Sequence, residues 1–256
     1  MGKSAHPWKA CHDAGETALE HQEPAEAERM FLSALRAAKK FRGVDQRRLR
    51  SLEGLAHVYL MTGQGSLAVR VYRFILESLE EAYGPRHSKL ADHLEHFALF
   101  FMPSHFSEAE ALLRRSRLIR QRAWGGSCPD LALCDVSEAF LHGRHGKLAE
   151  AEAFYRRAIR RIENARGSRH PDLVFYLQLL AGFYRAQGRY PEAEPLYSRV
   201  LMLVESQPGW GDQVLVNALE DLGRVYKFQG KQALAETLFQ RINEIWEKNA
   251  DSLFSA

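Results

Sequence analysis

The segment HPDLVFYLQLLAGFYRAQGRYPEAEPLYSRVL, residues 170–201, decides the fold because the chain repeats it. One period earlier it aligns with CPDLALCDVSEAFLHGRHGKLAEAEAFYRRAI, residues 128–159, and Gly188 falls on Gly146. One period later its LAGFY (180–184) aligns with LGRVY (222–226), and Gly188 falls on Gly230. Self-similarity at a period of about 42 residues is typical of helical-repeat solenoids.

Weaker copies of the same pattern fill the rest of the 256 residues. The link MPSH in the third copy is one residue shorter than its counterparts, so the spacing across it is also shorter by one. We expect a single array over residues 1–256, with repeats at about 5–42, 46–84, 87–124, 128–166, 170–207 and 212–250. An array of this length leaves no room for a separate catalytic domain.

Each copy has the pattern of two antiparallel helices. LQLLAGFYRAQ and EAEPLYSRVLML place apolar residues at i, i+3, i+4 and i+7, and a glycine between them marks a helix end and a turn. Small residues recur where two helices must cross closely. They are Ala56, Ala98, Ala139, Ala181 and Gly223 in the first helices, and Ala27, Ala68, Ala109, Ala151, Ala193 and Ala235 in the second helices. The sequence therefore predicts an all-α solenoid whose stacked helix pairs bury a shared core.

The pattern LA-x-[LFV]-Y…QG-x-Y-x-EAE-x-LY-x-R-[AV]-L, with HPD before the first helix, resembles the kinesin light chain class of tetratricopeptide repeats. The resemblance covers residues from about 47 to 246 well and the first copy poorly. It implies a right-handed superhelical solenoid of about six antiparallel helix pairs. It also implies that the first helices line a concave groove, that the second helices form the convex back, and that the protein is a non-enzymatic scaffold for protein–protein interaction.

The first helices supply the candidate binding residues, if they line a groove as the resemblance implies. These candidates are Glu53, His57, Glu95, Leu99, Met102, Leu133, Val136, Phe140, Phe175, Gln178, Leu179, Arg185, Glu220 and Arg224. The middle of the set is apolar, and a large exposed apolar stripe commonly marks an interaction site. We expect a peptide or partner-protein segment held there by apolar anchors and oriented by the charged ends. The alternative is that these residues pack between neighbouring helices.

Other functions of such arrays fit the sequence less well or stay open. The positions that correspond to the Lys, Asn and Arg clamp of modules that bind two carboxylates hold Glu, Val, Gln, Leu, Phe and Gly here. The acidic residues of LEDLG would also repel an acidic peptide. A regulatory sensor that closes around a small signalling peptide or metabolite stays open. So does a module that binds an acidic partner or nucleic acid through the arginines of residues 114–122 and 156–166. The simpler interpretation of those arginines is a solvated face paired with glutamates.

No motif of an enzyme or a metal site is present. The sequence contains no G-x-S-x-G, P-loop or HExxH motif, so we expect no catalytic activity and no cofactor. Eleven histidines, among them His93, His96, His105, His142 and His145, lack the matched ligands of a zinc site, so we expect no metal.

Composition gives expectations about location and assembly. The net charge of +3 implies no nucleic-acid partner by itself, and no run of eighteen apolar residues predicts a membrane span. Three cysteines at no metal-like spacing favour reduced thiols in a cytoplasmic protein. The last helix keeps many apolar residues: Leu238, Phe239, Ile242, Ile245, Trp246, Leu253 and Phe254. Since a solenoid end needs a polar cap, we expect either that the tail folds back or that two chains form a homodimer through this helix.

Overall fold

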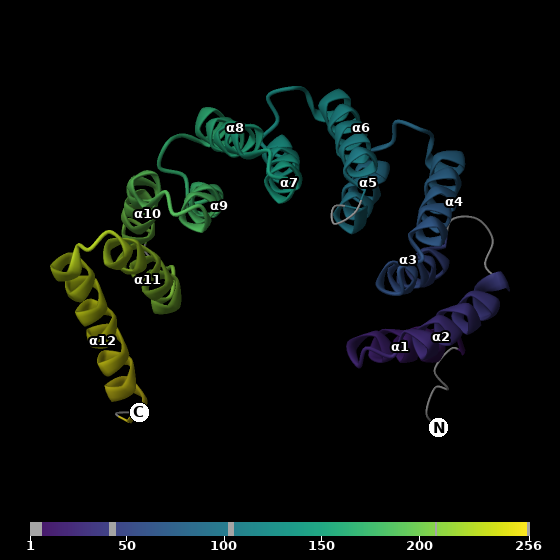
Figure 1. Cartoon of the computed structure of the whole chain (residues 1–256), viewed down its shortest axis with the longest axis horizontal. Coiled ribbons are helices and arrows are strands. Elements are labelled where there is room, and N and C mark those ends of the chain that lie inside the picture. Colours follow the sequence, from purple (N-terminus) through teal and green to yellow (C-terminus); the bar gives the residue numbers. More distant parts are fainter. Residues whose placement is uncertain (1–6, 41–44, 102–104, 208, 255–256) are drawn as a thin grey trace. The chain divides into compact units, whose positions relative to one another are not determined.

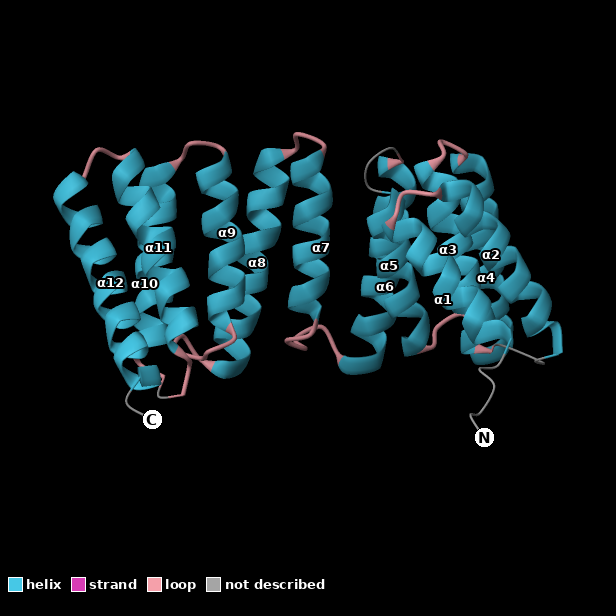
Figure 2. Cartoon of the chain, turned by 90° about the horizontal axis from the view of Figure 1, so that it is seen from below, coloured by secondary structure: helices cyan, strands magenta, loops and turns pink. Residues whose placement is uncertain are grey.

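The computed structural model describes residues 7–40, 45–101, 105–207 and 209–254, and within these ranges it contains helices and no strand. Its α-helices are α1 (Pro7–Glu20), α2 (Pro24–Ala37), α3 (Gln46–Met61), α4 (Gly65–Tyr83), α5 (Ser88–Phe101), α6 (Phe106–Trp124), α7 (Leu131–Arg144), α8 (Leu148–Arg166), α9 (Leu173–Ala186), α10 (Tyr190–Glu205), α11 (Asp212–Phe228) and α12 (Gln232–Phe254). Consecutive helices lie side by side in antiparallel pairs (Figures 1 and 2). The predicted all-α helical-repeat solenoid is confirmed.

The chain forms two compact units of three helix pairs each. Unit 1 is Met1–Gly125 with α1–α6, and unit 2 is Gly126–Ala256 with α7–α12. In unit 2 one core cluster runs from α7 to α11 and includes Leu177, Tyr184 and Tyr197. Such continuity follows from the repeat, because one helix pair has too little apolar surface to form a core alone.

Glycines with positive φ end many of the helices, and they recur every half repeat. Within the pairs, Gly63, Gly146, Gly188 and Gly230 have φ between 72° and 74°. Between the pairs, Gly84, Gly125, Gly167 and Gly209 also have positive φ. Glycine has no Cβ to clash in this left-handed conformation, so it is the favoured residue after a helix end. The predicted turns at Gly146, Gly188 and Gly230 are confirmed.

The predicted small residues lie in the core. Gly223 and all ten alanines predicted for the first and second helices are buried, and eight of those alanines have no exposed surface. A small side chain lets two helix axes approach, and larger residues then fill the space beside the crossing. Tyr72, Phe97 and Tyr184, for example, are among the largest fully or almost fully buried side chains.

Asp130 and Asp172, which the sequence places near helix starts, are the residues that precede α7 and α9. Neither carboxylate makes a hydrogen bond to the first turn of its helix. Asp172 instead forms an ion pair with Arg166, at the end of α8. The aspartate therefore connects two successive helix pairs as well as placing negative charge at a helix N-terminus.

Candidate partner-binding surface

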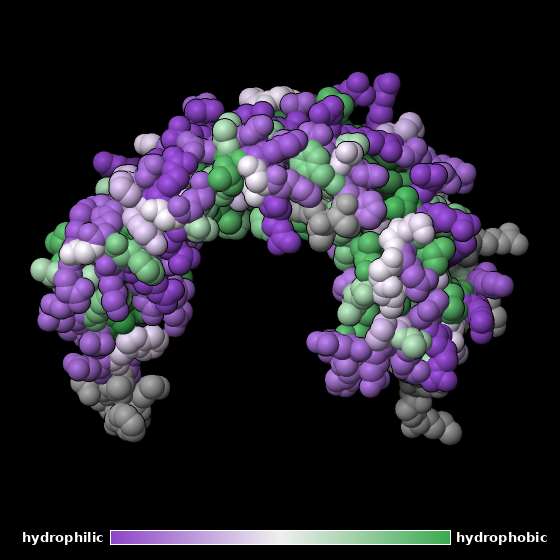
Figure 3. Space-filling model, in the orientation of Figure 1, coloured by the Kyte–Doolittle hydropathy of each residue, from purple (hydrophilic) through white to green (hydrophobic). Residues whose placement is uncertain are grey.

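Unit 2 exposes large apolar side chains on its first helices. Leu133 on α7, Phe140 on α7 and Phe175 on α9 are 45%, 46% and 49% exposed. Val136 and Leu179 are half-buried and pack against the core beneath. We call Leu133, Val136, Phe140, Phe175, Gln178 and Leu179 the unit 2 apolar face. In the space-filling view, hydrophobic residues gather over the α8 and α9 region among hydrophilic ones (Figure 3).

One pocket of the unit 2 apolar face lies between α7 and α9. It has a volume of about 300 Å³, and Phe140, Leu179 and Phe183 line it. Gly143 also lines it, and a Cβ at Gly143 would lie 3.4 Å from the Phe183 ring. The corresponding positions of the next two repeats hold Arg185 and Lys227. The pocket is therefore open because this repeat has glycine where its neighbours have long side chains.

A second pocket lies at the N-terminal ends of α9 and α11. It has a volume of about 660 Å³, and Phe175, Gln178, Trp210 and Val214 line it. The pocket is wide, and its walls combine aromatic and aliphatic carbon with the amide of Gln178. Concave, mostly apolar sites with a few polar groups are typical of binding sites.

The sequence predicts only some of the residues that form these pockets. It predicts Phe140 and Leu179 of the first pocket and Phe175 and Gln178 of the second, and the structure brings each pair together. It does not predict Phe183, Gly143, Trp210 and Val214. The available signal for Gly143 was a glycine at the position that Arg185 and Lys227 hold in the next two repeats. Trp210 lies in a loop between repeats, where the helical period gives no signal.

The charged candidates of unit 2 face one another. Arg224 donates a hydrogen bond of 2.8 Å to Glu220 on the same helix. Arg185 and Arg224 are both close enough to Asp221 to oppose the rise that burial causes in the pKa of that carboxyl. Much of the charge of Arg185, Glu220 and Arg224 is therefore compensated within unit 2.

The candidates of unit 1 have different environments. Glu53 and His57 line a pocket of about 310 Å³ that also contains His96 and Phe100. Burial, and then the charge of His96, lowers the pKa of His57. Glu53 lies 3.2 Å from Nδ1 of His93.

The remaining unit 1 candidates do not join that pocket. Glu95 accepts hydrogen bonds of 3.0 Å from both Ser116 and Arg120, so it holds α5 against α6. Leu99 is exposed. Met102 lies outside the described residues.

Many arginines of the second helices are paired. Arg115 lies 2.6 Å from Glu80, Arg199 lies 2.6 Å from Glu163, and Arg161 donates to Asp135 at 2.8 Å. Arginines that neutralise carboxylates in this way are less available to phosphates than a free basic strip would be.

Two features bear on metals and membranes. Among the described residues, no group of three or more His, Cys, Asp and Glu side chains is arranged to hold a metal ion. Within the same part of the chain, no helix has the length and hydrophobicity that crossing a membrane requires.

The last helix retains apolar surface. Leu238, Phe239 and Ile245 pack around the cluster that contains Ile242, while Trp246 and Leu234 are about half exposed. The side chains of Leu253 and Phe254 lie outside the described part of the chain.

Residues 135–206 and 173–248 match the family model described as tetratricopeptide repeat. Among solved structures, BtubC (BKLC) from P. vanneervenii has a TM-score of 0.62 at 16% identity, over 97% of this chain and 93% of that one. The nearly identical repeats of a putative kinesin light chain from Podosopora anserina have a TM-score of 0.50 at 18% identity, over 96% of this chain and 99% of that one. A tetratricopeptide repeat protein from Parabacteroides merdae has a TM-score of 0.51 at 17% identity, over 94% of this chain and 80% of that one. These identities show the fold alone. No curated protein matches the sequence significantly.

Proposed function

Because residues 135–248 match the tetratricopeptide repeat family and the fold of the chain resembles that of such proteins, we propose that it binds a partner-protein segment on the unit 2 apolar face. The fold suggests a scaffold for protein–protein interaction. Neither the fold nor the described side chains give evidence of catalysis. In this proposal Phe140 and Phe175 are the main anchors.

The observation that carries the proposal is the exposure of three large apolar side chains beside two pockets. Leu133, Phe140 and Phe175 are each nearly half exposed, and the two phenylalanines stand at the edges of separate pockets. Water contact with so much apolar surface is unfavourable, and a partner that covers it gains free energy. Aromatic residues at pocket edges are common energetic centres of interfaces.

The orientation of the partner is expected to depend on the surrounding charge. Arg144 lies with its guanidinium carbon 5.9 Å from the centre of the Phe140 ring, at the C-terminal end of α7. In unit 1, Glu53 and His57 line a separate pocket. Of the earlier candidates, Glu95 is the least suited to contact a partner, because Arg120 and Ser116 already bind its carboxylate.

Photo-crosslinking tests this proposal directly. A benzophenone amino acid at position 140 or 175 should capture the same partner from native extract, and one at Met202 should not. Met202 is a matched control because it is 55% exposed but lies on α10, a second helix. The double variant Phe140→Glu/Phe175→Glu should lose that partner at both low and high salt, while Met202→Glu retains it.

The outcomes separate the candidate functions. Each anchor replaced singly by Ala should weaken binding by about 1–3 kcal/mol. Equal capture by the wild type and by the correctly folded double variant would show that the surface is not the binding site. Binding that survives the double variant but falls steeply with salt would favour the paired arginines and an acidic partner or nucleic acid.

We also propose a cytoplasmic location and a homodimer through α12. The cysteines are present as thiols rather than disulfides, which is ordinary in a reducing compartment. Trp246 and Leu234 leave apolar surface on α12 that a second copy could cover. Sedimentation of the wild type and of Trp246→Glu at high concentration tests the dimer, and a monomer in both samples would exclude it.

A further inference from the structure

A repeated ion pair connects successive second helices in unit 2. Arg189, just before α10, donates a 2.8 Å hydrogen bond to Glu152 of α8. Lys231, just before α12, donates a 2.6 Å hydrogen bond to Glu194 of α10. Each glutamate directly follows the buried alanine of its helix, Ala151 or Ala193. The pair therefore belongs to the repeat itself.

The glutamate at this repeat position also forms an ion pair with an arginine on its own helix. Glu152 lies 2.9 Å from Arg156, and Glu110 of α6 lies 3.6 Å from Arg114, both one turn further along. In each case the carboxylate compensates a guanidinium four residues later.

Unit 1 lacks this glutamate in α4. The residue after its buried alanine, Ala68, is Val69. When α4 and the helix pair after it are aligned with α8 and the helix pair after it, His105 falls on Arg189 and Phe101 falls on Tyr184. One turn after Val69 stands Arg73, at the position of Arg114 and Arg156. In the described part of the chain, Arg73 makes no ion pair and no hydrogen bond. The change from glutamate to valine therefore removes the carboxylate but keeps its arginine.

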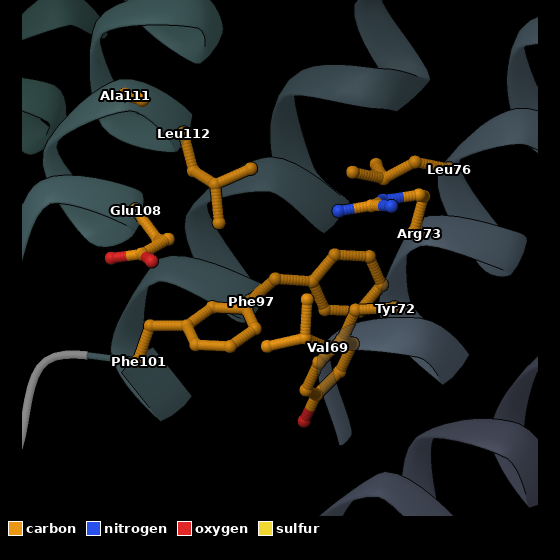
Figure 4. A pocket seen from close by; sticks show the side chains of 9 residues that line it. All are labelled: Val69, Tyr72, Arg73, Leu76, Phe97, Phe101, Glu108, Ala111 and Leu112. Atoms are coloured by element: carbon orange, nitrogen blue, oxygen red, sulfur yellow. The ribbon is translucent and has the colours of Figure 1, made fainter. Parts of the chain in front are cut away.

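A pocket of about 230 Å³ lies beside Val69 and Arg73, and residues of α4, α5 and α6 line it. Figure 4 shows the rings of Tyr72, Phe97 and Phe101 in it, with Leu112 on the α6 side. The Tyr72 and Phe97 ring centres are 4.3 Å apart. Arg73 and Glu108 lie at opposite edges of the cluster (Figure 4). Apart from these two side chains the lining is almost entirely carbon.

We propose that this pocket binds a small monocarboxylate with an aromatic or branched aliphatic body. The ligand carboxylate takes the place of the missing glutamate and pairs with Arg73. The body lies against Tyr72, Phe97 and Phe101 and excludes water from them. The volume suits a single ring with a short chain, since a cavity of about 150 Å³ already holds benzene.

The charge pattern selects one negative charge. A single guanidinium pairs well with one carboxylate, whereas a phosphate dianion is best held by several donors. Glu108, at the opposite edge, disfavours a second acidic group on the ligand. The site lies wholly in unit 1, so it is independent of the proposed partner surface on α7, α9 and α11.

Titration of the full chain with 3-phenylpropionate tests the proposal, with protein NMR and calorimetry as readouts. Wild type should bind it and gain thermal stability, because a ligand of the native state raises the unfolding temperature. Arg73→Gln should weaken binding about tenfold, as expected for loss of a charged hydrogen bond. Arg156→Gln is the matched control and should bind like wild type. The uncharged 3-phenylpropanamide should bind wild type and Arg73→Gln equally weakly.

Two further variants close the pocket. Val69→Glu places a carboxylate beside Arg73, as in the other repeats, and should abolish binding. Leu112→Phe fills the space from α6 with the residue that the next repeat has, Phe154, and should abolish binding too. Helical content by circular dichroism shows whether each variant is folded. Absence of binding to wild type, or equal binding to wild type, Arg73→Gln and folded Val69→Glu, would overturn the proposal.

Discussion

At the scale of single residues, the first repeats are held together by a phenylalanine that lies against two glycines. Phe31 of α2 is completely buried. A Cβ on Gly54 of α3 would lie 2.5 Å from its Cζ, and a Cβ on Gly15 of α1 would lie 2.9 Å from its ring. Both distances are too short for a real contact. The ring therefore occupies space that an alanine at either position would need.

Gly54→Ala should destabilise unit 1 by about 1–2 kcal/mol. The overpacking of a core costs about 1–3 kcal/mol, and the better helix propensity of alanine returns up to about 1 kcal/mol. Gly211→Ala is the control, because nothing lies within 4 Å of a Cβ there. Thermal unfolding followed by circular dichroism measures both variants. A Gly54→Ala protein as stable as the wild type would show that the ring moves aside without cost.

These contacts mark what the sequence could predict at the residue scale. The buried small residues recur at the repeat period, both in the first helices and in the second helices, so their positions follow from the sequence alone. Gly54 does not recur at that period, and its partner Phe31 belongs to a different helix pair. Position 54 needs glycine because the Phe31 ring of α2 packs against α3 there. The repeat period does not reveal that contact.

At the scale of helices, periodic ion pairs in unit 2 connect α10 to α8 and α12 to α10. Arg199 of α10 lies 2.6 Å from Glu163 of α8 and donates a 2.8 Å hydrogen bond to the carbonyl of Ser168. Arg241 of α12 pairs in the same way with Glu205 of α10. The sequence could show that these helices are rich in arginine. It could not show which carboxylate each arginine reaches, because the partners lie far apart along the chain.

Arg199→Ala should lower the free energy of unfolding by about 1 kcal/mol, with much of the loss disappearing at high salt. The pair is about a quarter exposed, which keeps it near the upper end of surface ion pairs, and salt screens it. Arg160→Ala, an exposed arginine of α8 without an ion pair in the described structure, should change stability little. Chemical denaturation at two salt concentrations measures both. Equal effects of the two substitutions would contradict a role for the Arg199 pair.

At the scale of the whole molecule, the repeat explains why the fold was predictable and the binding surface only partly so. The helix pairs follow from the period, because every repeat must present the same apolar stripe to the next. The surface depends instead on departures from the repeat, such as Gly143 among arginine and lysine, or Val69 among glutamates. A departure can be seen in the sequence, but its consequence depends on which side chains surround it. Trp210, in a loop, has no counterpart in the period at all.

Tyrosines buried in both units make the whole molecule sensitive to alkaline pH. Burial raises the pKa of Tyr59, Tyr72, Tyr155, Tyr176, Tyr184 and Tyr197, six of the nine tyrosines. The negative charge of Glu53 contributes further at Tyr72. A raised pKa in the folded state means that the unfolded chain releases these protons first. The stability from the neutral phenols is therefore complete below about pH 10 and is lost as the pH rises above it.

A pH titration of ultraviolet absorbance together with circular dichroism tests this sensitivity. The phenolate absorbance of the five buried tyrosines, Tyr72, Tyr155, Tyr176, Tyr184 and Tyr197, should appear only as helical signal is lost. Tyr72→Phe should move the midpoint of alkaline unfolding to higher pH, because it removes a buried hydroxyl that has no hydrogen-bond partner among the described residues. Complete phenolate formation while the helical signal is unchanged would show that these rings ionise without unfolding. In that case the packing around them would be looser than the structure indicates.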